Sequence, residues 1–457
     1  MGERGLLHAI DFGTSNSSII VSAADGSLTP VPDPLGRAGS ESVRTSVCVR
    51  NGAIEVGEAA ERAKNLDPAA YRNEFKRDFG DPIPTKLGDM MMTSDELTAE
   101  VLRFLRDQAL RANPAEPELV VITVPASWEE GNKELMRSAA RRAGYGTTTV
   151  ELVAEPVAAL AYVFAGHPDP TRRLTVMVYD LGGGTFDCAV ARGHAEGYEV
   201  LGVPGGLDDV AGSRFDGEIL ADVRERFPAS APSQPAPGQP APGQPVPTAD
   251  DTALLRRNLT LRDGCERLKW ELSAASSADM LLPDAQPPAR FRLDRTDFEA
   301  RIRPLITQTI GECDQLLGTL GLDWPGLDRV VPVGGSSRIP LVGQLLAERR
   351  GRPVLAIDRP DIAVAYGAAL YGHDLLANQQ PQNVYVNGRK RMILTRQVGF
   401  AEVIGLAFDR PPAGQDVSIT VTYERAAGTK ATGTLTAGRA VRIKNGTIFN
   451  VTATDKS

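Results

Sequence analysis

Three apolar runs along this chain end abruptly in polar turns that contain glycine. The turns begin at Asp11, Asp180 and Gly334. Short apolar runs bounded by turn residues are typical of buried strands. We therefore predict three strands whose ends make backbone amides available, and these strands cover residues 6–10, 174–179 and 330–333.

Longer stretches between these strands repeat apolar positions with the period of a helix. Alternating strands and helices favour an α/β architecture. The predicted helices cover residues 94–112, 131–144, 155–164, 215–227, 254–272, 298–320 and 339–350.

The segment 229–248 interrupts this pattern, because it repeats a Pro-Ala-Pro-Gly-Gln phrase and has almost nothing to bury. Such a composition is typical of an extended, disordered loop. Helical patterns on both sides indicate an insertion within one domain. A simple spacer is the preferred interpretation, and a proline-rich ligand for a partner is the alternative.

After Tyr371 the chain changes to short alternating runs, such as the apolar positions between 417 and 423, punctuated by glycines. Alternation with period two predicts half-buried strands. We expect a small β domain, either a compact sandwich or a meander, rather than a helical lid.

The chain has 457 residues, more than the roughly 250–300 that one core fills, so two large lobes and an accessory piece are expected. A formal net charge of -8 gives no general attraction for nucleic acid. The four cysteines lack the paired spacing of a disulfide framework or zinc site. No leader-type segment precedes Asp11 and no run approaches about 20 apolar residues, so we expect a soluble, cytoplasmic protein without a membrane partner.

The first turn, Asp11-Phe-Gly-Thr-Ser-Asn16, has the chemistry of a phosphate and metal site. The carboxylate of Asp11 is suited to a hydrated divalent cation. Small and hydroxylated neighbours let backbone amides approach phosphate oxygens closely, and these neighbours are Gly13, Thr14, Ser15 and Asn16. Alone, such a phrase is more often an ordinary turn.

The second turn, Asp180-Leu-Gly-Gly-Gly-Thr-Phe-Asp187, repeats this chemistry. Asp180 ends a strand, and Thr185 and Asp187 return polar groups to the opening. The glycines between them, Gly182, Gly183 and Gly184, remove side chains. A lone triple-glycine turn can simply join two strands. Two such turns about 170 residues apart instead favour an internal repeat that clamps one triphosphate.

The third turn, Gly334-Gly-Ser-Ser-Arg-Ile-Pro340, follows a strand and opens a helix. This arrangement suits a base or ribose that lies over small residues, here Gly334, Gly335 and Ser336. Arg338 is placed to stack on adenine. The alternative interpretation is a helix-start arginine that points to solvent.

Together these phrases resemble the ATPase domain of the Hsp70 (DnaK-like) chaperone family, a branch of the actin and sugar-kinase superfamily. The resemblance spans about residues 6–373 and extends to phrases at 121–126, 155–162 and 361–369. It implies a two-lobed, actin-like α/β ATPase of ribonuclease H-like repeats, followed by a small all-β domain. The expected parts are lobe I at 1–170, lobe II at 171–376 with the insertion 229–248, a linker at 377–383 and the β domain at 384–457.

By the same resemblance, Lys76 orients the attacking water and the γ-phosphate, a task suited to a point charge. Glu155 would hold metal-bound water, and Asp11, Asp180 and Asp187 would complete the carboxylates around hydrated Mg²⁺. The implied reaction is in-line hydrolysis of ATP without a covalent intermediate. From the residues alone, Lys76 would be interpreted as a surface lysine and Glu155 as a first-turn carboxylate favoured by the helix dipole.

Family positions that contact ribose and adenine match Glu266, Lys269, Ser273 and Asp361. Trp270 stands where some members carry an arginine that sandwiches the base, so its ring is a candidate to stack on adenine. The alternative is an exposed or core helix aromatic without a ligand. ATP or ADP and Mg²⁺ are the expected cofactors, with K⁺ as a candidate additional ion.

Two features depart from the family. Its nucleotide relay uses a proline and an arginine, matched here by Pro125 and Lys133, and lysine lacks the forked guanidinium. After Gly372 the sequence has no family-type linker, peptide-binding sandwich or lid. Substrate-peptide binding is therefore not carried over from the resemblance.

The resemblance implies a slowly hydrolysing ATPase that acts as a chaperone-type conformational switch. The implied partners are a J-domain co-chaperone, a nucleotide-exchange factor and an unfolded client. An actin-like filament or scaffold ATPase is the alternative. Small-molecule kinase activity is a third hypothesis, which Lys76 disfavours because a lysine at that position favours water as the attacking group.

Overall fold

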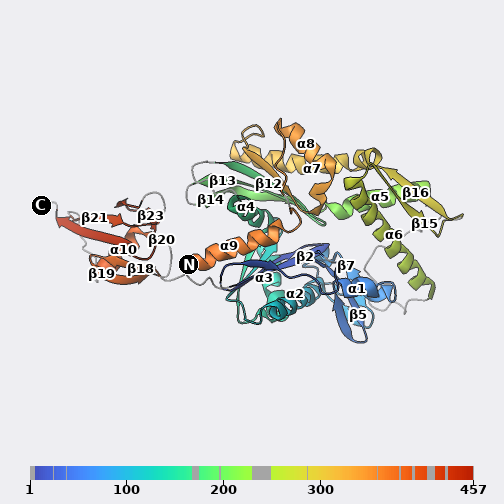
Figure 1. Ribbon diagram of the computed structural model, residues 1–457, viewed down its shortest axis with the longest axis horizontal. Helices are drawn as coiled ribbons and strands as arrows, with labels where there is room; N and C mark the ends of the chain where they lie inside the picture. Colours follow the sequence, from blue (N-terminus) through green and yellow to red (C-terminus); the bar gives the residue numbers. More distant parts are fainter. Residues whose placement is uncertain are drawn as a thin grey trace.

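The computed structural model describes residues 6–455 apart from 24, 38, 167–173, 195–196, 229–248, 286, 358, 380–381, 394–396, 409–416 and 428–430. Figure 1 shows two large α/β lobes and a smaller unit, coloured red, beyond the carboxyl end of helix α9 (Ala363–Gln379). The predicted insertion 229–248 lies outside the described residues.

The first lobe is built on a sheet with the strand order β11-β10-β1-β2-β3, and β4 pairs with β2. Strand β1 is parallel to β10 and antiparallel to β2, so β1 and β2 form the hairpin that carries the first turn. Every residue of β10 is buried, as expected for a central strand covered on both faces. The strands of this lobe are β1 Leu7–Phe12, β2 Asn16–Ser22, β3 Leu28–Pro30, β4 Val43–Arg44, β5 Ser46–Arg50, β6 Ala53–Val56, β7 Tyr71–Asn73, β8 Thr85–Leu87, β9 Met90–Met92, β10 Leu119–Val124 and β11 Thr149–Ala154. Its helices are α1 Glu58–Ala63, α2 Ser94–Ala112, α3 Glu130–Ala140 and α4 Glu155–Ala165, with short helical turns η1 Pro68–Ala70, η2 Phe75–Asp78 and η3 Arg141–Tyr145.

The second lobe repeats this plan with the strand order β14-β13-β12-β17. Strand β12 is antiparallel to β13 and parallel to β17, as β1 is to β2 and β10. The two lobes are therefore copies of one strand arrangement, and the predicted two-lobed α/β class is confirmed. The elements of this lobe are β12 Thr175–Leu181, β13 Phe186–His194, β14 Gly197–Leu207, α5 Gly212–Arg226, α6 Ala249–Ala274, β15 Ser277–Leu282, β16 Ala289–Asp294, α7 Arg295–Leu320, β17 Arg329–Val333, η5 Gly335–Arg338 and α8 Pro340–Arg350.

Helices α4 and α9 pack on each other between the two sheets (Figure 1). Helix α4 also contacts β12 and β13 of the second lobe, and α9 contacts β1 and β10 of the first. One hydrophobic cluster accordingly joins Val121 of the first sheet, Val178 of the second, Ala158 of α4 and Ala368 of α9. The predicted lobe boundary between residues 170 and 171 lies outside the described residues, and the two lobes share this core.

The C-terminal unit is a five-stranded sheet in the order β19-β18-β24-β21-β22, crossed by helix α10. Val403 and Ile404 of α10 pack into a core with Val384 and Phe449. Its elements are β18 Gln382–Val386, β19 Arg389–Ile393, β20 Gln397–Gly399, α10 Phe400–Ala407, β21 Val417–Glu424, β22 Gly433–Leu435, β23 Ala440–Arg442 and β24 Ile448–Asp455.

The β-rich character of this unit is confirmed, but the predicted sandwich or meander is wrong, and the unit is not all-β. Its central strands β18 and β24 are parallel, and parallel neighbours require a crossover rather than a tight turn. The predicted linker 377–383 is also mostly regular structure, because α9 continues to Gln379 and β18 begins at Gln382. Leu375 and Leu376 pack against the shared core and extend the helix that far.

Among the described residues, no helix has both the length and the apolar character needed to cross a membrane.

Candidate functional site

A cleft of about 1710 Å³ lies between the two lobes. All the predicted site residues except Asp187 line it, so the cleft brings together residues from seven separate regions of the chain. The residues from the three turns are Asp11, Gly13, Thr14, Ser15, Asn16, Asp180, Gly182, Gly183, Gly184, Thr185, Gly334, Gly335, Ser336 and Arg338. The others are Lys76, Glu155, Glu266, Lys269, Trp270, Ser273 and Asp361.

The first two turns meet face to face across the lobes. A Cβ atom on Gly184 would lie 2.1 Å from Thr14 Oγ1, and one on Gly183 would lie 2.3 Å from Ser15 Oγ. Real Cβ atoms do not approach other atoms so closely, so this contact requires glycine. The turns consequently bring the backbones of both lobes to the same point of the cleft.

The third turn packs on the second. Gly334 has a φ of 81°, and a Cβ atom there would lie 2.5 Å from the carbonyl oxygen of Leu181. The hydroxyl of Ser336 donates a hydrogen bond to the carbonyl oxygen of Gly182 at 2.7 Å. These contacts fix the position of the third turn beside the glycines of the second.

Four carboxylates gather where the turns meet: Glu155, Asp180 and Asp187 are buried, and Asp11 is partly buried. Asp11 and Asp180 occupy matching positions, each one residue before the end of its strand. Burial and the nearby charge of Glu155 raise the pKa of Asp11 to about 6, although a hydrogen bond from Thr123 opposes this change. Burial and Glu155 likewise raise the pKa of Asp180 well above its ordinary value. These raised pKa values mean that the surroundings of the cluster favour the neutral, protonated carboxyl groups over the charged carboxylates.

Asp187 lies behind the cleft rather than in it. It is opposite Asp180 in the β12–β13 hairpin and is 1% exposed. Its Oδ1 accepts a hydrogen bond from the backbone amide of Ala126 at 2.8 Å, which ties the second lobe to the loop after β10. Burial and then the charge of Glu155 raise the pKa of Asp187 to about 8.

Lys76 supplies the positive charge of this cluster. It lies on η2, is 5% exposed, and donates hydrogen bonds to Glu155 Oε1 at 2.7 Å and to the carbonyl oxygen of Phe12 at 2.6 Å. The interpretation of Lys76 as a surface lysine is therefore wrong. A buried lysine requires a charged partner, and Glu155 at the start of α4 is that partner.

The carboxylate cluster fits a hydrated divalent cation. One ammonium group faces four carboxylates. Burial and repulsion from neighbouring carboxylates raise the pKa values of Asp11, Asp180 and Asp187, and a cation would relieve that repulsion. Among the described residues, no three acidic, histidine or cysteine side chains converge closely enough to coordinate one ion directly. Mg²⁺ commonly keeps several of its waters, so contact through water suits this spacing.

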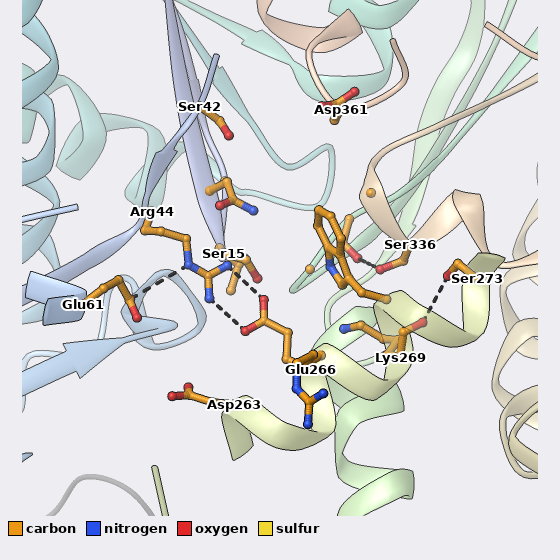
Figure 2. Close-up of a pocket in the computed structure, with 18 of the residues that line it drawn as sticks. Ser15, Ser42, Arg44, Glu61, Asp263, Glu266, Lys269, Ser273, Ser336 and Asp361 are labelled. Carbon is orange, nitrogen blue, oxygen red and sulfur yellow. Dashed lines mark hydrogen bonds and ion pairs between the residues drawn. The ribbon is translucent and has the colours of Figure 1, made fainter. Parts of the chain in front are cut away.

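On the other side of the cleft, an ion pair joins the lobes. Figure 2 shows Arg44 of β4 and Glu266 of α6 pointing toward each other across the pocket. Two hydrogen bonds at 2.9 and 2.8 Å form a forked pair between them. Burial alone would raise the pKa of Glu266, but Arg44 holds it below its ordinary value. A second pair, between Lys64 and Asp263 at 2.7 Å, lies nearby.

The matches to known proteins agree with this geometry. Residues 64–388 match the family model described as Hsp70 protein. The chain belongs to the Hsp70 family. The chaperone protein DnaK of Thermotoga petrophila is 30% identical over 369 residues, which make up 79% of this chain and 58% of that relative. The DnaK of Thermosipho africanus is 30% identical over 380 residues, 82% of this chain and 60% of the relative. This Hsp70-family chain thus spans 58–60% of the length of these curated relatives.

The C-terminal unit matches a different family. Residues 383–455 match the family model described as Multiubiquitin. The mixed sheet with a central parallel pair and one crossing helix is the arrangement known as a β-grasp. The C-terminal unit of this Hsp70-family chain is therefore similar to the Multiubiquitin family model, and we call it the ubiquitin-like unit.

The remaining predicted residues lie around the wider part of the cleft. Lys269 is held by Asp216 at 2.6 Å and by the carbonyl oxygen of Gly212 at 2.9 Å. Ser273 donates to the Lys269 carbonyl oxygen one helical turn earlier. Arg338 and Asp361 pair with each other at 2.8 Å and are half-exposed.

Trp270 is 69% exposed although it lines the cleft. This excludes the interpretation of Trp270 as a core aromatic. The ring is available to a planar ligand that enters between the lobes.

Three partners of the predicted residues were missed from the sequence: Arg44, Thr123 and Asp216. Arg44 lies in a two-residue strand without a motif, and Asp216 is one of many acidic residues on amphipathic helices. Thr123 donates to Asp11 Oδ1 at 2.7 Å, because β10 is parallel to β1 and aligns these two residues. The phrase at 121–126 was noted, but only the strand register shows which of its side chains faces Asp11.

Proposed function

We propose that this Hsp70-family chain binds ATP in the cleft and slowly hydrolyses it to ADP and phosphate. The observation that carries this proposal is the meeting of two glycine turns beside one buried lysine within a cluster of carboxylates. Backbone amides from both lobes suit the phosphates of a single nucleotide. The Arg338–Asp361 pair and Trp270 then border the side of the cleft available to the nucleoside.

Each residue of the cluster that lines the cleft has a task in this proposal. Asp11 and Asp180, with Glu155, would hold hydrated Mg²⁺, which when bound neutralises the charge of the phosphates. Lys76 uses two of its three N–H donors on Phe12 and Glu155, and one remains for the γ-phosphate or the attacking water. The fixed ammonium favours the charge that develops in the transition state.

The cleft lies between two lobes that share a core, which supports a nucleotide-dependent switch. The Arg44–Glu266 pair spans the opening, so a nucleotide that separates or draws together these side chains changes the relation of the lobes. We infer that this change is the output of hydrolysis, as in a chaperone ATPase. A J-domain co-chaperone and a nucleotide-exchange factor are the partners that this role requires, and an unfolded client remains a separate proposal.

In this chain the two lobes are followed by the ubiquitin-like unit rather than by a peptide-binding sandwich. The change in lobe arrangement would therefore act on a different kind of partner. Residues 382–457 contain 11 Lys or Arg and 5 Asp or Glu, a net charge of +6, whereas the whole chain carries -8. Opposite charge steers proteins toward each other. We propose that this unit is a docking module for an acidic protein partner.

The experiment that tests the proposed activity is a measurement of ATP binding and ADP formation by the full chain, with and without Mg²⁺. ADP formation that requires Mg²⁺ and is lost in Asp180→Asn is the expected result. A protein that binds no ATP, or that hydrolyses ATP equally well as Asp180→Asn, would contradict the proposal. The variant Asp279→Asn is a matched control, because Asp279 also lines the cleft but lies on β15, away from the turns.

A further inference from the structure

A second cavity of about 450 Å³ adjoins the cleft behind the phosphate turns. This rear cavity shares Thr14, Lys76, Gly184 and Thr185 with the cleft. Its outer rim includes Ser127 and Asp209, neither of which lines the cleft. The place where a terminal phosphate would lie therefore borders two open spaces.

Three hydrogen bonds between the lobes cross the rim of the rear cavity. Arg77 donates to Ser213 Oγ at 2.9 Å and to Asp209 Oδ1 at 3.4 Å, and Ser127 donates to Asp208 Oδ1 at 2.7 Å. The side chain of Asp209 is 93% exposed, and exposed ion pairs are weak. Small movements between the lobes are therefore sufficient to open this rim.

The lining of the rear cavity suits a small oxyanion in transit. Lys76 lies at its inner end and Arg77 at its rim, so one positive charge follows the other along the path. The guanidinium matches the geometry of phosphate oxygens. The acidic residues of the rim, Asp208, Asp209 and Glu129, disfavour a stably bound anion. The two cations attract a phosphate ion into the rear cavity, and the acidic residues of the rim prevent its tight binding, so the ion can pass through.

We propose that inorganic phosphate leaves through the rear cavity while ADP still occupies the cleft, and that Arg77 closes the opening. This inference rests on the proposed ATP hydrolysis. Bound ADP would block the front of the cleft, so the product phosphate would have the rear cavity as its way out. Opening of the Arg77 bridges would then set the rate of phosphate release.

Two substitutions alter this path without touching the proposed catalytic residues. Gly131 lines the rear cavity, and a Cβ atom there would meet no atom within 4 Å, so a side chain can start there without a clash and Gly131→Phe is expected to narrow the path. Gly131→Ala is the matched control. Arg77→Ala removes two of the three bridges and opens the rim.

The test uses the full chain loaded with ADP and Mg²⁺ and radiolabelled inorganic phosphate. Equilibrium dialysis gives the Kd, and dilution gives the release rate. Substitution of a residue that lies on the exit path changes the rate constants of phosphate association and release by the same factor, so the Kd does not change. We expect release to slow roughly fivefold or more in Gly131→Phe and to accelerate by about threefold or more in Arg77→Ala, with each Kd within about twofold of the parent value.

Unchanged release rates in both variants would overturn the inference. The inference would also be overturned if the change in release rate were matched by an equal change in the Kd. Failure of the ADP-loaded chain to bind phosphate would overturn it as well. Acid-quenched single turnovers measure the hydrolysis step separately. Absence of hydrolysis in the parent chain refutes the proposed function, whereas normal hydrolysis with unaltered release refutes only the exit path.

Discussion

Replacement of Trp270 by alanine is expected to weaken nucleotide binding without weakening the fold. The ring is 69% exposed, so its removal leaves no cavity, and surface substitutions of this kind change the free energy of unfolding by less than about 0.5 kcal/mol. Stacking of a base on an aromatic side chain contributes about 1–3 kcal/mol as measured by alanine substitution. The Kd for ATP and ADP should therefore rise by about 5- to 150-fold in Trp270→Ala.

Isothermal titration calorimetry with ATP and ADP measures this effect, and thermal unfolding of the free protein checks the fold. Trp270→Phe keeps a stacking surface and should remain close to the parent protein. Val203→Ala is a control for loss of an exposed apolar side chain outside the cleft, since Val203 is 82% exposed. If Trp270→Ala bound both nucleotides with the parent Kd, the proposed place of the adenine ring would be wrong.

Three further predictions concern the charges and contacts of the cleft. The pKa of Asp187 is raised from 3.8 to about 8, so the metal-free native protein retains a proton that the unfolded chain releases. Its free energy of unfolding should consequently fall as pH rises from about 4 to about 8, by up to about 1.4 kcal/mol per pH unit, in denaturant titrations. Gly184→Ala should destabilise the protein by about 1–3 kcal/mol in the same assay, because its Cβ atom would collide with Thr14. Arg44→Ala breaks the pair with Glu266 and should release ADP about tenfold faster in stopped-flow experiments.

Each of these predictions has a matched control. Asp187→Asn should reduce the dependence of stability on pH, with Asp11 and Asp180 contributing the remainder, and an unchanged slope would assign the whole dependence to other groups. Gly335→Ala should be tolerated, because a Cβ atom there meets nothing within 4 Å, and equal destabilisation by both alanines would refute the steric argument. Arg50→Ala breaks an exposed pair with Glu55 within one lobe. It should leave ADP release unchanged, and a parent rate in Arg44→Ala would show that the cross-lobe pair does not restrain the nucleotide.

The strands and turns were predictable because their signals are local. Asp11 and Asp180 each follow an apolar run and precede glycines, and the repeated phrase indicated two similar lobes. The structure explains these glycines, because Thr14 lies so close to Gly184 that a larger residue at position 184 would collide with it. Contacts across the lobes left no such trace, and Arg44 has no feature in the sequence that marks it as the partner of Glu266.

The errors also have physical causes. Lys76 looks like a surface residue in isolation, because only a distant carboxylate, Glu155, makes its burial favourable. The short segment Phe400–Ala407, which is apolar apart from Glu402 and Gly405, lies in the tail for which strands were predicted, because a short apolar run fits a strand or a buried helix equally well by periodicity. The parallel pairing of β18 with β24 depends on segments about 60 residues apart and gives no local signal.

Single-turnover hydrolysis of ATP by Lys76→Ala, beside the parent chain and Lys444→Ala as a control on the C-terminal unit, decides whether the buried lysine is part of a working ATPase. Removal of one fixed donor to developing charge typically slows a reaction roughly 100-fold or more. We predict that Lys76→Ala still binds ATP but hydrolyses it roughly 100-fold or more slowly, and that Lys444→Ala hydrolyses ATP at the parent rate. Hydrolysis by Lys76→Ala at the parent rate would contradict the proposed site.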